Sequence, residues 1–260
     1  MPDTFVITSR QNPLIQDLRD RADPEVAKGL FLEGLHLVEE ALKVGMPIHH
    51  LIVIPALADT ELIKRAMAKA KRTTQVSAYV MKALSDVEAP QGVIAICQKP
   101  TWDWAALVSK SPAPIVILDV LQDPGNAASI LRTAEAAGAA GVVTTPGTVK
   151  LFTPKALRGA SGSTLRLPLL EHVAPKEIIQ KLKAAGYSLL AAEGSAGTPY
   201  TEIDWRKPWG VVLGQEGAGV SSVWKGPSTQ SVSIPMKAPV ESLNVAAAAA
   251  IFLYASKIRN

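Results

Sequence analysis

The sequence has one cysteine, no long apolar run and no signal-peptide pattern, and each absence removes a class of protein. Cys97 is the only cysteine among 260 residues, so a disulfide within the chain is impossible. It lies in the apolar run GVIAIC, which favours a buried strand residue over a reactive thiol. No apolar run is long enough to cross a bilayer, and the start of the chain lacks a charged region followed by an apolar one. We therefore expect a cytoplasmic protein without membrane contact or redox chemistry.

Two further absences concern cofactors. The histidines show no spacing typical of metal ligands, so we expect no bound metal; they are His36, His49, His50 and His172. The turn after the apolar run PIVILDV lacks the GxGxxG glycine pattern. This lack disfavours a nicotinamide-dependent oxidoreductase.

The charge of the chain is modest and unevenly distributed. The net charge is +4, and all of the excess lies after residue 100, because residues 1–100 carry 12 basic and 12 acidic side chains. The run ELIKRAMAKAKR nevertheless places Arg65, Lys69 and Arg72 on one face of a predicted helix. Charge alone favours a solvated helix face there, and it leaves an RNA-binding surface open.

Strand-like and helix-like runs alternate along the chain, which indicates an α/β fold. The proline-rich segment 100–114 predicts a linker between a small first domain (1–99) and a second domain (115–260). The second domain contains continuous apolar runs, such as PIVILDV and WGVVLG, that are typical of parallel strands buried on both faces.

For the first domain we predict a small βαβ unit. Its basic helix spans 59–72, the run QVSAYV (75–80) forms a strand, and a short helix begins at Lys82.

Ligands of open parallel sheets gather beyond the carboxyl ends of the strands, so the residues after each apolar run are the candidates for a site. After PIVILDV, the segment QDPGNAASILRTAEAAG predicts a helix that Asn126 fits as a cap. Arg132 of this helix either pairs with Glu135, which would stabilise the helix by only about 0.2–0.5 kcal/mol, or presents its guanidinium to a phosphate.

The second candidate is the glycine-rich loop of WGVVLGQEGAGVS. Gly214, Gly217 and Gly219 allow a ligand to approach the backbone. Glu216 has little packing role in such a loop, so it is a candidate for function.

The third candidate is the segment IPMKAPVESLNVAAAAA. Ser242 or Asn244 begins a helix whose backbone N–H groups face the strand ends. Met236 and Leu243 are either core residues or the apolar walls of a pocket for a flat ring.

In this order and spacing the three motifs resemble the SpoU-like, or TrmH-type, RNA ribose 2'-O-methyltransferases of the knotted SPOUT superfamily. NAASILRTA, LGQEGAGVS and IPMKAPVESLNV carry the resemblance, which covers roughly residues 115–257. FLEGLHLVEEAL and APQGVIAI resemble the ribosomal-protein-like RNA-binding domain that precedes the catalytic domain in many members. The segment ITSRQNPLIQDLRD is similar to one in members that act on rRNA. Gln215 replaces the usual asparagine, and Ala238, before Pro239, replaces the usual glycine.

The resemblance implies a trefoil-knotted, mostly parallel α/β catalytic domain that forms a homodimer through the knot region. It implies S-adenosylmethionine as methyl donor and no metal. Backbone groups and apolar side chains would contact this cofactor at Leu213, Gly214, Ile234, Met236 and Leu243. Polar side chains would position the substrate and the loops at Asn126, Arg132, Glu216, Ser242 and Asn244.

The resemblance also implies how the attacking ribose 2'-hydroxyl is supported. A guanidinium keeps its proton at neutral pH, so we expect Arg132 to orient an RNA phosphate rather than to accept the hydroxyl proton. Lys155 and Arg158 follow another predicted strand, and they either contact RNA phosphates or are ordinary surface charges.

The implied substrate is 23S ribosomal RNA, and tRNA is the alternative. A non-catalytic RNA-binding protein that retains the fold is a second alternative, against which Asn126, Arg132, Glu216 and Asn244 argue. The alanines from Ala246 to Ala250 predict a helix small enough to lie close to the sheet.

Overall fold

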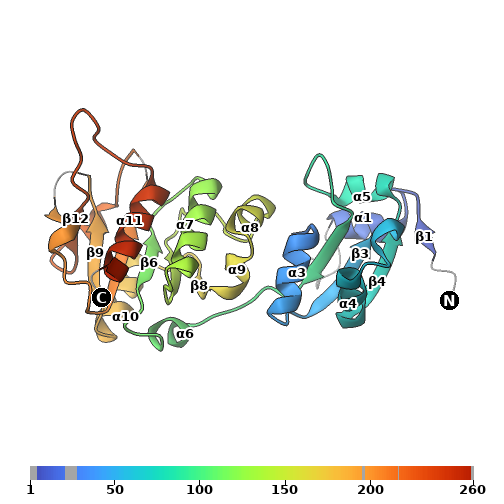
Figure 1. Ribbon diagram of the computed structural model, residues 1–260, viewed down its shortest axis with the longest axis horizontal. Helices are drawn as coiled ribbons and strands as arrows, with labels where there is room; N and C mark the ends of the chain where they lie inside the picture. Colours follow the sequence, from blue (N-terminus) through green and yellow to red (C-terminus); the bar gives the residue numbers. More distant parts are fainter. Residues whose placement is uncertain (1–4, 21–27, 195–196, 216, 259–260) are drawn as a thin grey trace. The chain divides into compact units, whose positions relative to one another are not determined.

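The computed structural model describes residues 5–20, 28–194, 197–215 and 217–258 (Figure 1). The chain divides into two compact units, Met1–Pro100 and Thr101–Asn260. No helix among the described residues is long and apolar enough to span a membrane.

The first unit contains a mixed five-stranded sheet. Its strands are, in sheet order, β1 (Val6–Ile7), β4 (Ala70–Val76), β3 (Ile48–Val53), β5 (Val93–Cys97) and β2 (Leu30–Glu33). Neighbours are parallel from β1 to β3, whereas β5 runs antiparallel to both β3 and β2. The central strands β3 and β5 are almost completely buried, as their apolar sequences predict.

Four described helices and one 3-10 turn surround this sheet. They are α1 (Pro13–Asp20), α3 (Leu35–Lys43), η1 (Pro55–Leu57), α4 (Glu61–Lys69) and α5 (Ala78–Leu84). Helices α1 and α5 bury Ile15, Leu18, Val80 and Met81 in one cluster with the sheet. Helices α3 and α4 pack on β5 and β3.

The predicted helix over 59–72 is confirmed as far as Lys69 and is wrong in its last three residues. Helix α4 ends at Lys69, and the chain passes at once into β4, so Arg72 lies on a strand and does not share a helix face with Arg65 and Lys69. Thr73, Thr74 and Val76 favour a strand because they are β-branched, and β4 pairs with β3 along most of its length.

The next two predicted elements also need correction. The strand predicted over 75–80 ends at Val76, and the following helix begins well before Lys82. The Ser77 side chain accepts a hydrogen bond from the backbone N–H of Val80, which is the geometry of a helix N-cap, so helix α5 begins at Ala78.

The second unit contains a seven-stranded sheet in which all neighbours are parallel, as the continuous apolar runs predict. Its strands are, in sheet order, β10 (Thr198–Pro199), β12 (Gln230–Ser233), β9 (Ser188–Ala192), β11 (Trp209–Leu213), β6 (Ile115–Leu118), β7 (Gly141–Thr144) and β8 (Leu169–Leu170). The mostly parallel α/β architecture expected for this part of the chain is therefore confirmed.

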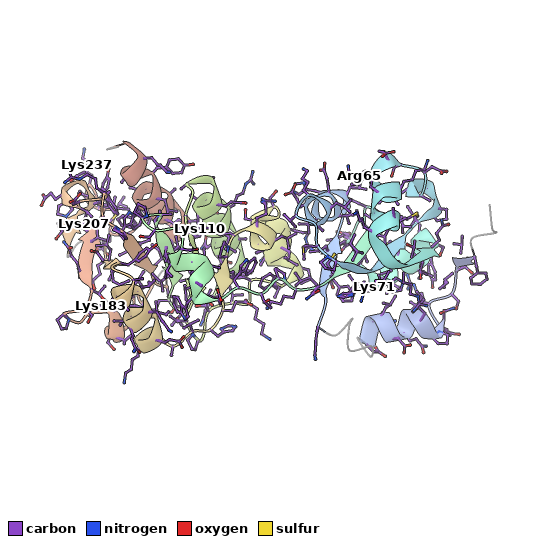
Figure 2. The ribbon with its side chains drawn as sticks, turned by 90° about the horizontal axis from the view of Figure 1, so that it is seen from below. Arg65, Lys71, Lys110, Lys183, Lys207 and Lys237 are labelled. Carbon is purple, nitrogen blue, oxygen red and sulfur yellow. The ribbon has the colours of Figure 1, made fainter. Side chains whose placement is uncertain are left out.

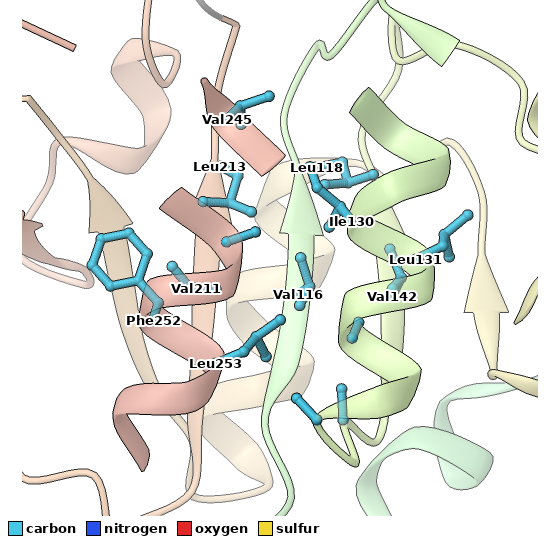
Figure 3. Packing of buried hydrophobic residues seen from close by; sticks show 14 of the residues in the cluster. Val116, Leu118, Ile130, Leu131, Val142, Val211, Leu213, Val245, Phe252 and Leu253 are labelled. Carbon is cyan, nitrogen blue, oxygen red and sulfur yellow. The ribbon is translucent and has the colours of Figure 1, made fainter. Parts of the chain in front are cut away.

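Helices accompany both faces of this sheet. They are α6 (Trp104–Val108), α7 (Pro124–Ala136), α8 (Pro154–Ala160), α9 (Ser163–Arg166), α10 (Pro175–Ala184) and α11 (Val245–Ile258), with 3-10 turns η2 (Tyr200–Glu202) and η3 (Ser222–Trp224). Helices α7 and α11 lie side by side over β6 and β11, where Ile130, Leu131, Phe252 and Leu253 share one apolar cluster (Figure 3). Helices α6 and α10 contribute to a second cluster.

The segment 100–114 contains helix α6 and packs on the second unit. Leu107 is fully buried there, and the indole Nε1 of Trp104 donates a hydrogen bond to Glu177 at 2.9 Å. Proline content alone does not reveal this anchoring.

Candidate functional site

The carboxyl ends of four strands of the second sheet meet at one edge. Strands β6, β11, β9 and β12 are successive and parallel, so the loops that follow them emerge together. The loops that contain or lead into the three motifs begin at residues 119, 214 and 234. The topology therefore brings together segments that lie far apart along the chain.

A cavity of about 140 Å³ lies at this edge. All five residues predicted to contact a cofactor line it, and they are Leu213, Gly214, Ile234, Met236 and Leu243. Phe252 of α11 closes the apolar side. The cavity adjoins a wider hollow of about 1020 Å³ that shares part of this lining.

Gly214 is required by the shape of the loop that follows β11. Gln215 and Gly219 exchange two backbone hydrogen bonds, of 3.1 and 2.7 Å, which close a tight turn. A Cβ atom on Gly214 would lie 2.1 Å from the carbonyl oxygen of Gly219, and Gly219 itself has φ +68°. Only glycine fits both positions without moving the backbone. Glu216, predicted to act here, lies outside the described residues.

The start of α11 forms another wall of the cavity. The Oδ1 atom of Asn244 accepts hydrogen bonds from the backbone N–H groups of Ala246 and Ala247, so Asn244 caps the helix. Ser242 is exposed and lines the cavity. Of the two predicted helix starts, Asn244 is therefore the one that caps the helix.

Asn126 is not the cap that the sequence suggests. Asp123 caps α7, because its side chain accepts a hydrogen bond from the backbone N–H of Asn126 at 2.6 Å and Pro124 occupies the first helical position. The side chain of Asn126 is thereby available for another contact. Its Oδ1 atom accepts a hydrogen bond from Nδ2 of Asn244 at 3.0 Å, which connects the first motif to the third.

Arg132 lies on the exposed side of α7 and does not line the cavity. The alternative of a pair with Glu135 is wrong, because Glu135 makes two hydrogen bonds to Arg166 of α9, at 2.5 and 2.8 Å. Within the described part of the chain Arg132 has no carboxylate partner. Its guanidinium is therefore open to a ligand from outside.

Sequence reasoning missed Asp119, which is buried at the end of β6. Its Oδ1 accepts a hydrogen bond from the hydroxyl of Thr145 at 3.0 Å, and its Oδ2 accepts one from the backbone N–H of Ser221 at 2.7 Å. Asp119 thus ties the loop after β11 to the ends of two neighbouring strands. Val120, the next residue, has φ +56°, a strained value for a β-branched residue.

Glu193, the other residue that was missed, lines both the cavity and the wider hollow. It follows β9 and forms an ion pair with Lys225 at 3.6 Å. Both missed carboxylates directly follow apolar strand runs, the signal that singled out the three motifs.

The basic residues predicted to bind RNA occupy several separate elements. Arg65 and Lys69 are exposed on α4, with Arg65 at the surface of the first unit (Figure 2), and Arg72 is exposed on β4. Lys155 and Arg158 are exposed on α8 of the second unit.

One group of potential metal ligands does occur, on helix α3. His36, Glu39 and Glu40 bring their ligand atoms within 4.8 Å of one another. The ammonium group of Lys43 lies 3.4 Å from Glu39 and 3.0 Å from Glu40, so both carboxylates already have a cationic partner. Cys97 is buried in β5 as predicted, and burial raises the pKa of its thiol to about 12.

Comparisons with known proteins agree on one family. The model of the SpoU rRNA Methylase family matches residues 113–254, and that of an MRM3-like substrate binding domain matches residues 14–95. An uncharacterized tRNA/rRNA methyltransferase of Synechocystis is 35% identical, with 98% of this chain and 94% of the relative covered. The 23S rRNA guanosine 2'-O-methyltransferase RlmP of Bacillus subtilis is 32% identical, with 95% of this chain and 97% of the relative covered.

Solved structures give the same result. The crystal structure of an rRNA methyltransferase from Sinorhizobium meliloti with bound S-adenosylmethionine has a TM-score of 0.86 and 26% identity, and the match covers 98% of both chains. The chain therefore belongs to the SpoU rRNA methylase family and is a methyltransferase.

Proposed function

We propose that the chain transfers the methyl group of S-adenosylmethionine to a ribose 2'-hydroxyl of 23S ribosomal RNA. The observation that carries this proposal is the cavity at the carboxyl edge of the second sheet. Five residues that are each predicted to contact the cofactor line this one cavity, and they come from two distant segments, 213–214 and 234–243.

The lining of the cavity suits S-adenosylmethionine. Leu213, Ile234 and Leu243 offer apolar walls to a flat adenine ring, and Gly214 and Gly219 line the same cavity without a side chain that would take up space. Glu193, at the rim, offers a carboxylate to the hydroxyl or ammonium groups of the same molecule. When bound, the cofactor supplies a methyl group on a sulfonium.

The polar residues of the three motifs position the substrate. The Asn126–Asn244 hydrogen bond fixes the start of α7 against the capped start of α11, so that substrate and cofactor segments keep one geometry. Arg132, exposed and without a carboxylate partner in the described chain, holds an RNA phosphate. Ser242 lines the cavity and orients the ribose there, and the family resemblance assigns Glu216 a part in positioning the substrate.

Ribosomal RNA is favoured over tRNA by the relatives and by the first unit. RlmP is named for 23S rRNA and matches along nearly its whole length, which includes the first unit. We assign residues 1–99 as the RNA substrate-binding domain, 100–114 as its connection, and 115–260 as the catalytic domain. Since the substrate is ribosomal RNA, we place the reaction in the cytoplasm.

The target is tested by mapping 2'-O-methyl groups in 23S rRNA and tRNA from cells with and without the gene. We expect one 2'-O-methyl group to disappear from 23S rRNA. Loss of one from tRNA alone would establish the tRNA alternative. Unchanged RNA, together with no binding of S-adenosylmethionine in calorimetry, would leave the non-catalytic RNA-binding alternative.

RNA contacts extend beyond the cavity. Lys155 and Arg158 on α8, and Arg65, Lys69 and Arg72 on the first unit, are exposed cations that suit phosphates. Because they lie on separate elements, each should contribute a small share of the affinity. Single substitutions to alanine should weaken RNA binding. Each should also reduce the slope of the logarithm of the binding constant against the logarithm of the salt concentration by about one.

We further propose a trefoil knot and a homodimer. After β12, which lies next to the edge strand β10, the chain returns to the middle of the sheet, where α11 packs beside α7. Such a return suits a chain end that passes through a loop. Tyr254 and Ala247 leave an apolar part of α11 exposed, which suits contact with a second copy. Light scattering should give twice the chain mass, and a monomer at working concentration would contradict the dimer.

A further inference from the structure

An arginine and a tyrosine are stacked on the surface of the first unit. The Cζ atom of Arg10 lies 3.8 Å from the centroid of the Tyr79 ring. The Nε and Nη2 groups of Arg10 both donate hydrogen bonds to the backbone carbonyl oxygen of Tyr79, at 3.3 Å each. The guanidinium is therefore fixed in position and orientation against the ring.

The backbone on both sides of this pair is well fixed. Before Arg10, the short strand β1 pairs with β4, and the carbonyl of Ile7 accepts a hydrogen bond from the N–H of Ser77. After Arg10, the side chain of Asn12 accepts a hydrogen bond from the N–H of Leu14 at the start of α1. Arg10 and Tyr79 thus project from a turn and a helix start that are held independently of their own contact.

Both residues of the pair still offer surface or hydrogen-bond donors to a ligand. The Tyr79 side chain is 60% exposed, although tyrosine is a large and partly apolar residue. A guanidinium has five N–H donors, and the carbonyl of Tyr79 takes two of them, so three remain. Arg10 has no carboxylate partner in the described chain, and Lys82 adds an exposed cation one turn after Tyr79.

We propose that the Arg10–Tyr79 pair is a stacking platform for an unpaired RNA base. An aromatic ring and a guanidinium plane are the surfaces on which proteins stack bases of single-stranded RNA, and the remaining N–H donors suit an adjacent phosphate or base edge. A base-paired duplex offers no free base face to this platform. The inference rests on the proposed RNA substrate, and it assigns recognition of a loop or bulge to the first unit.

The platform is tested by the binding of the full chain to a single-stranded oligoribonucleotide, followed by fluorescence anisotropy. Tyr79→Ala should weaken binding by roughly fivefold to a hundredfold, the range found for the loss of one base–aromatic stack. Tyr79→Phe retains the ring and should bind within about twofold of the native chain. Arg10→Lys keeps the charge but loses the planar face, so it should also weaken binding.

Two controls separate stacking from charge and from folding. Arg19→Lys changes an exposed arginine on α1 of the same unit and should leave RNA binding unchanged. An oligoribonucleotide with abasic positions should bind weakly to the native chain and lose little further affinity with Tyr79→Ala. Thermal unfolding of each variant reports any structural damage, and rescue by Tyr79→Phe identifies the ring as the cause.

Several outcomes would overturn the platform. Equal RNA binding by the native chain and Tyr79→Ala, equal losses with abasic and base-containing RNA, or equal sensitivity with a duplex each contradicts stacking. A partner protein as the true occupant would give the first of these results. Titration of the same preparations with S-adenosylmethionine tests the methyltransferase proposal separately, because neither Arg10 nor Tyr79 is among the residues that line the cavity.

Discussion

The two sheets of the molecule differ in the relative directions of their strands. In the first unit β5 runs antiparallel to both of its neighbours, so the loops emerge at both edges, and the candidate RNA contacts lie on separate helices and on β4. In the second unit all strands are parallel, and the loops after β9, β11 and β12 converge on one cavity. A parallel sheet gathers side chains from distant segments, whereas the mixed sheet distributes them over a surface.

This difference fits the proposed division of roles, in which the second unit binds S-adenosylmethionine and the first contacts RNA at its surface. It also predicts different responses to substitution. A change at the converging edge should have a large and specific effect, and a change on the first unit a smaller one. The following experiments test this contrast, from the largest expected effect to the smallest.

Gly214→Ala should produce the largest loss. Its new Cβ would clash with backbone atoms of Gly219 and Val220, and these atoms cannot rotate away as the end of a side chain can. We expect the affinity for S-adenosylmethionine in calorimetry to fall by about a hundredfold, which corresponds to about 3 kcal/mol. Gly217→Ala, in the same loop, is the matched control, because nothing lies within 4 Å of its added Cβ. Equal affinities in the two variants would contradict the assigned loop geometry.

Arg132→Lys should affect the reaction without affecting the cofactor. A lysine keeps the charge but loses the planar pair of donors that a phosphate accepts. We expect kcat for RNA methylation to fall by about tenfold to a hundredfold, the effect of one hydrogen bond to a charged group, and the affinity for S-adenosylmethionine to remain unchanged. Arg206→Lys, at an exposed arginine bonded to Asp204, is the control. Full activity of Arg132→Lys would refute the phosphate role.

Ala249→Leu should destabilise the second unit. Ala249 is fully buried in the cluster that contains Phe252 and Leu253, so three added carbon atoms overpack the interface of α11 with the sheet (Figure 3). The free energy of unfolding in urea should fall by about 1–3 kcal/mol. Ala184→Leu adds the same atoms at an exposed position of α10, and it should change stability by less than about 0.5 kcal/mol. Similar losses in both variants would contradict this placement of α11.

The pH dependence of the free energy of unfolding tests the burial of Cys97 in the first unit. Burial raises the pKa of the thiol from its ordinary value of 9.0 to about 12 in the folded chain. Above pH 9 the unfolded chain therefore loses a proton that the folded chain keeps, so stability falls as the pH rises. The slope from this group should be about 1.4 kcal/mol per pH unit. Cys97→Ala should remove that slope between pH 9 and 11, and an unchanged slope would show that other groups cause it.

Much of the second unit follows from its sequence. Long apolar runs such as PIVILDV leave little choice other than buried parallel strands, and the residues after them form the site. Leu213, Ile234 and Leu243 line one cavity because Leu213 ends β11, Ile234 follows β12, and Leu243 precedes the capped start of α11.

The errors occur where tertiary contacts decide between local alternatives. Helix α4 and strand β4 follow each other without a turn residue, so the helical pattern continues in the sequence after the helix has ended at Lys69. Asn126 and Asp123 are both good helix caps. Pro124 at the first helical position places the cap at Asp123, and the side chain of Asn126 instead accepts a hydrogen bond from Asn244, far along the chain. Such long-range partners are not visible in local patterns.

The assignment of the two units is tested most directly by hydrogen–deuterium exchange of the full chain with and without S-adenosylmethionine. We predict slower exchange in the loops that follow β9, β11 and β12 and in the first turn of α11, and unchanged exchange in β2 to β5 of the first unit. Protection confined to the first unit, or absent from the loop that begins at Gly214, would contradict the account.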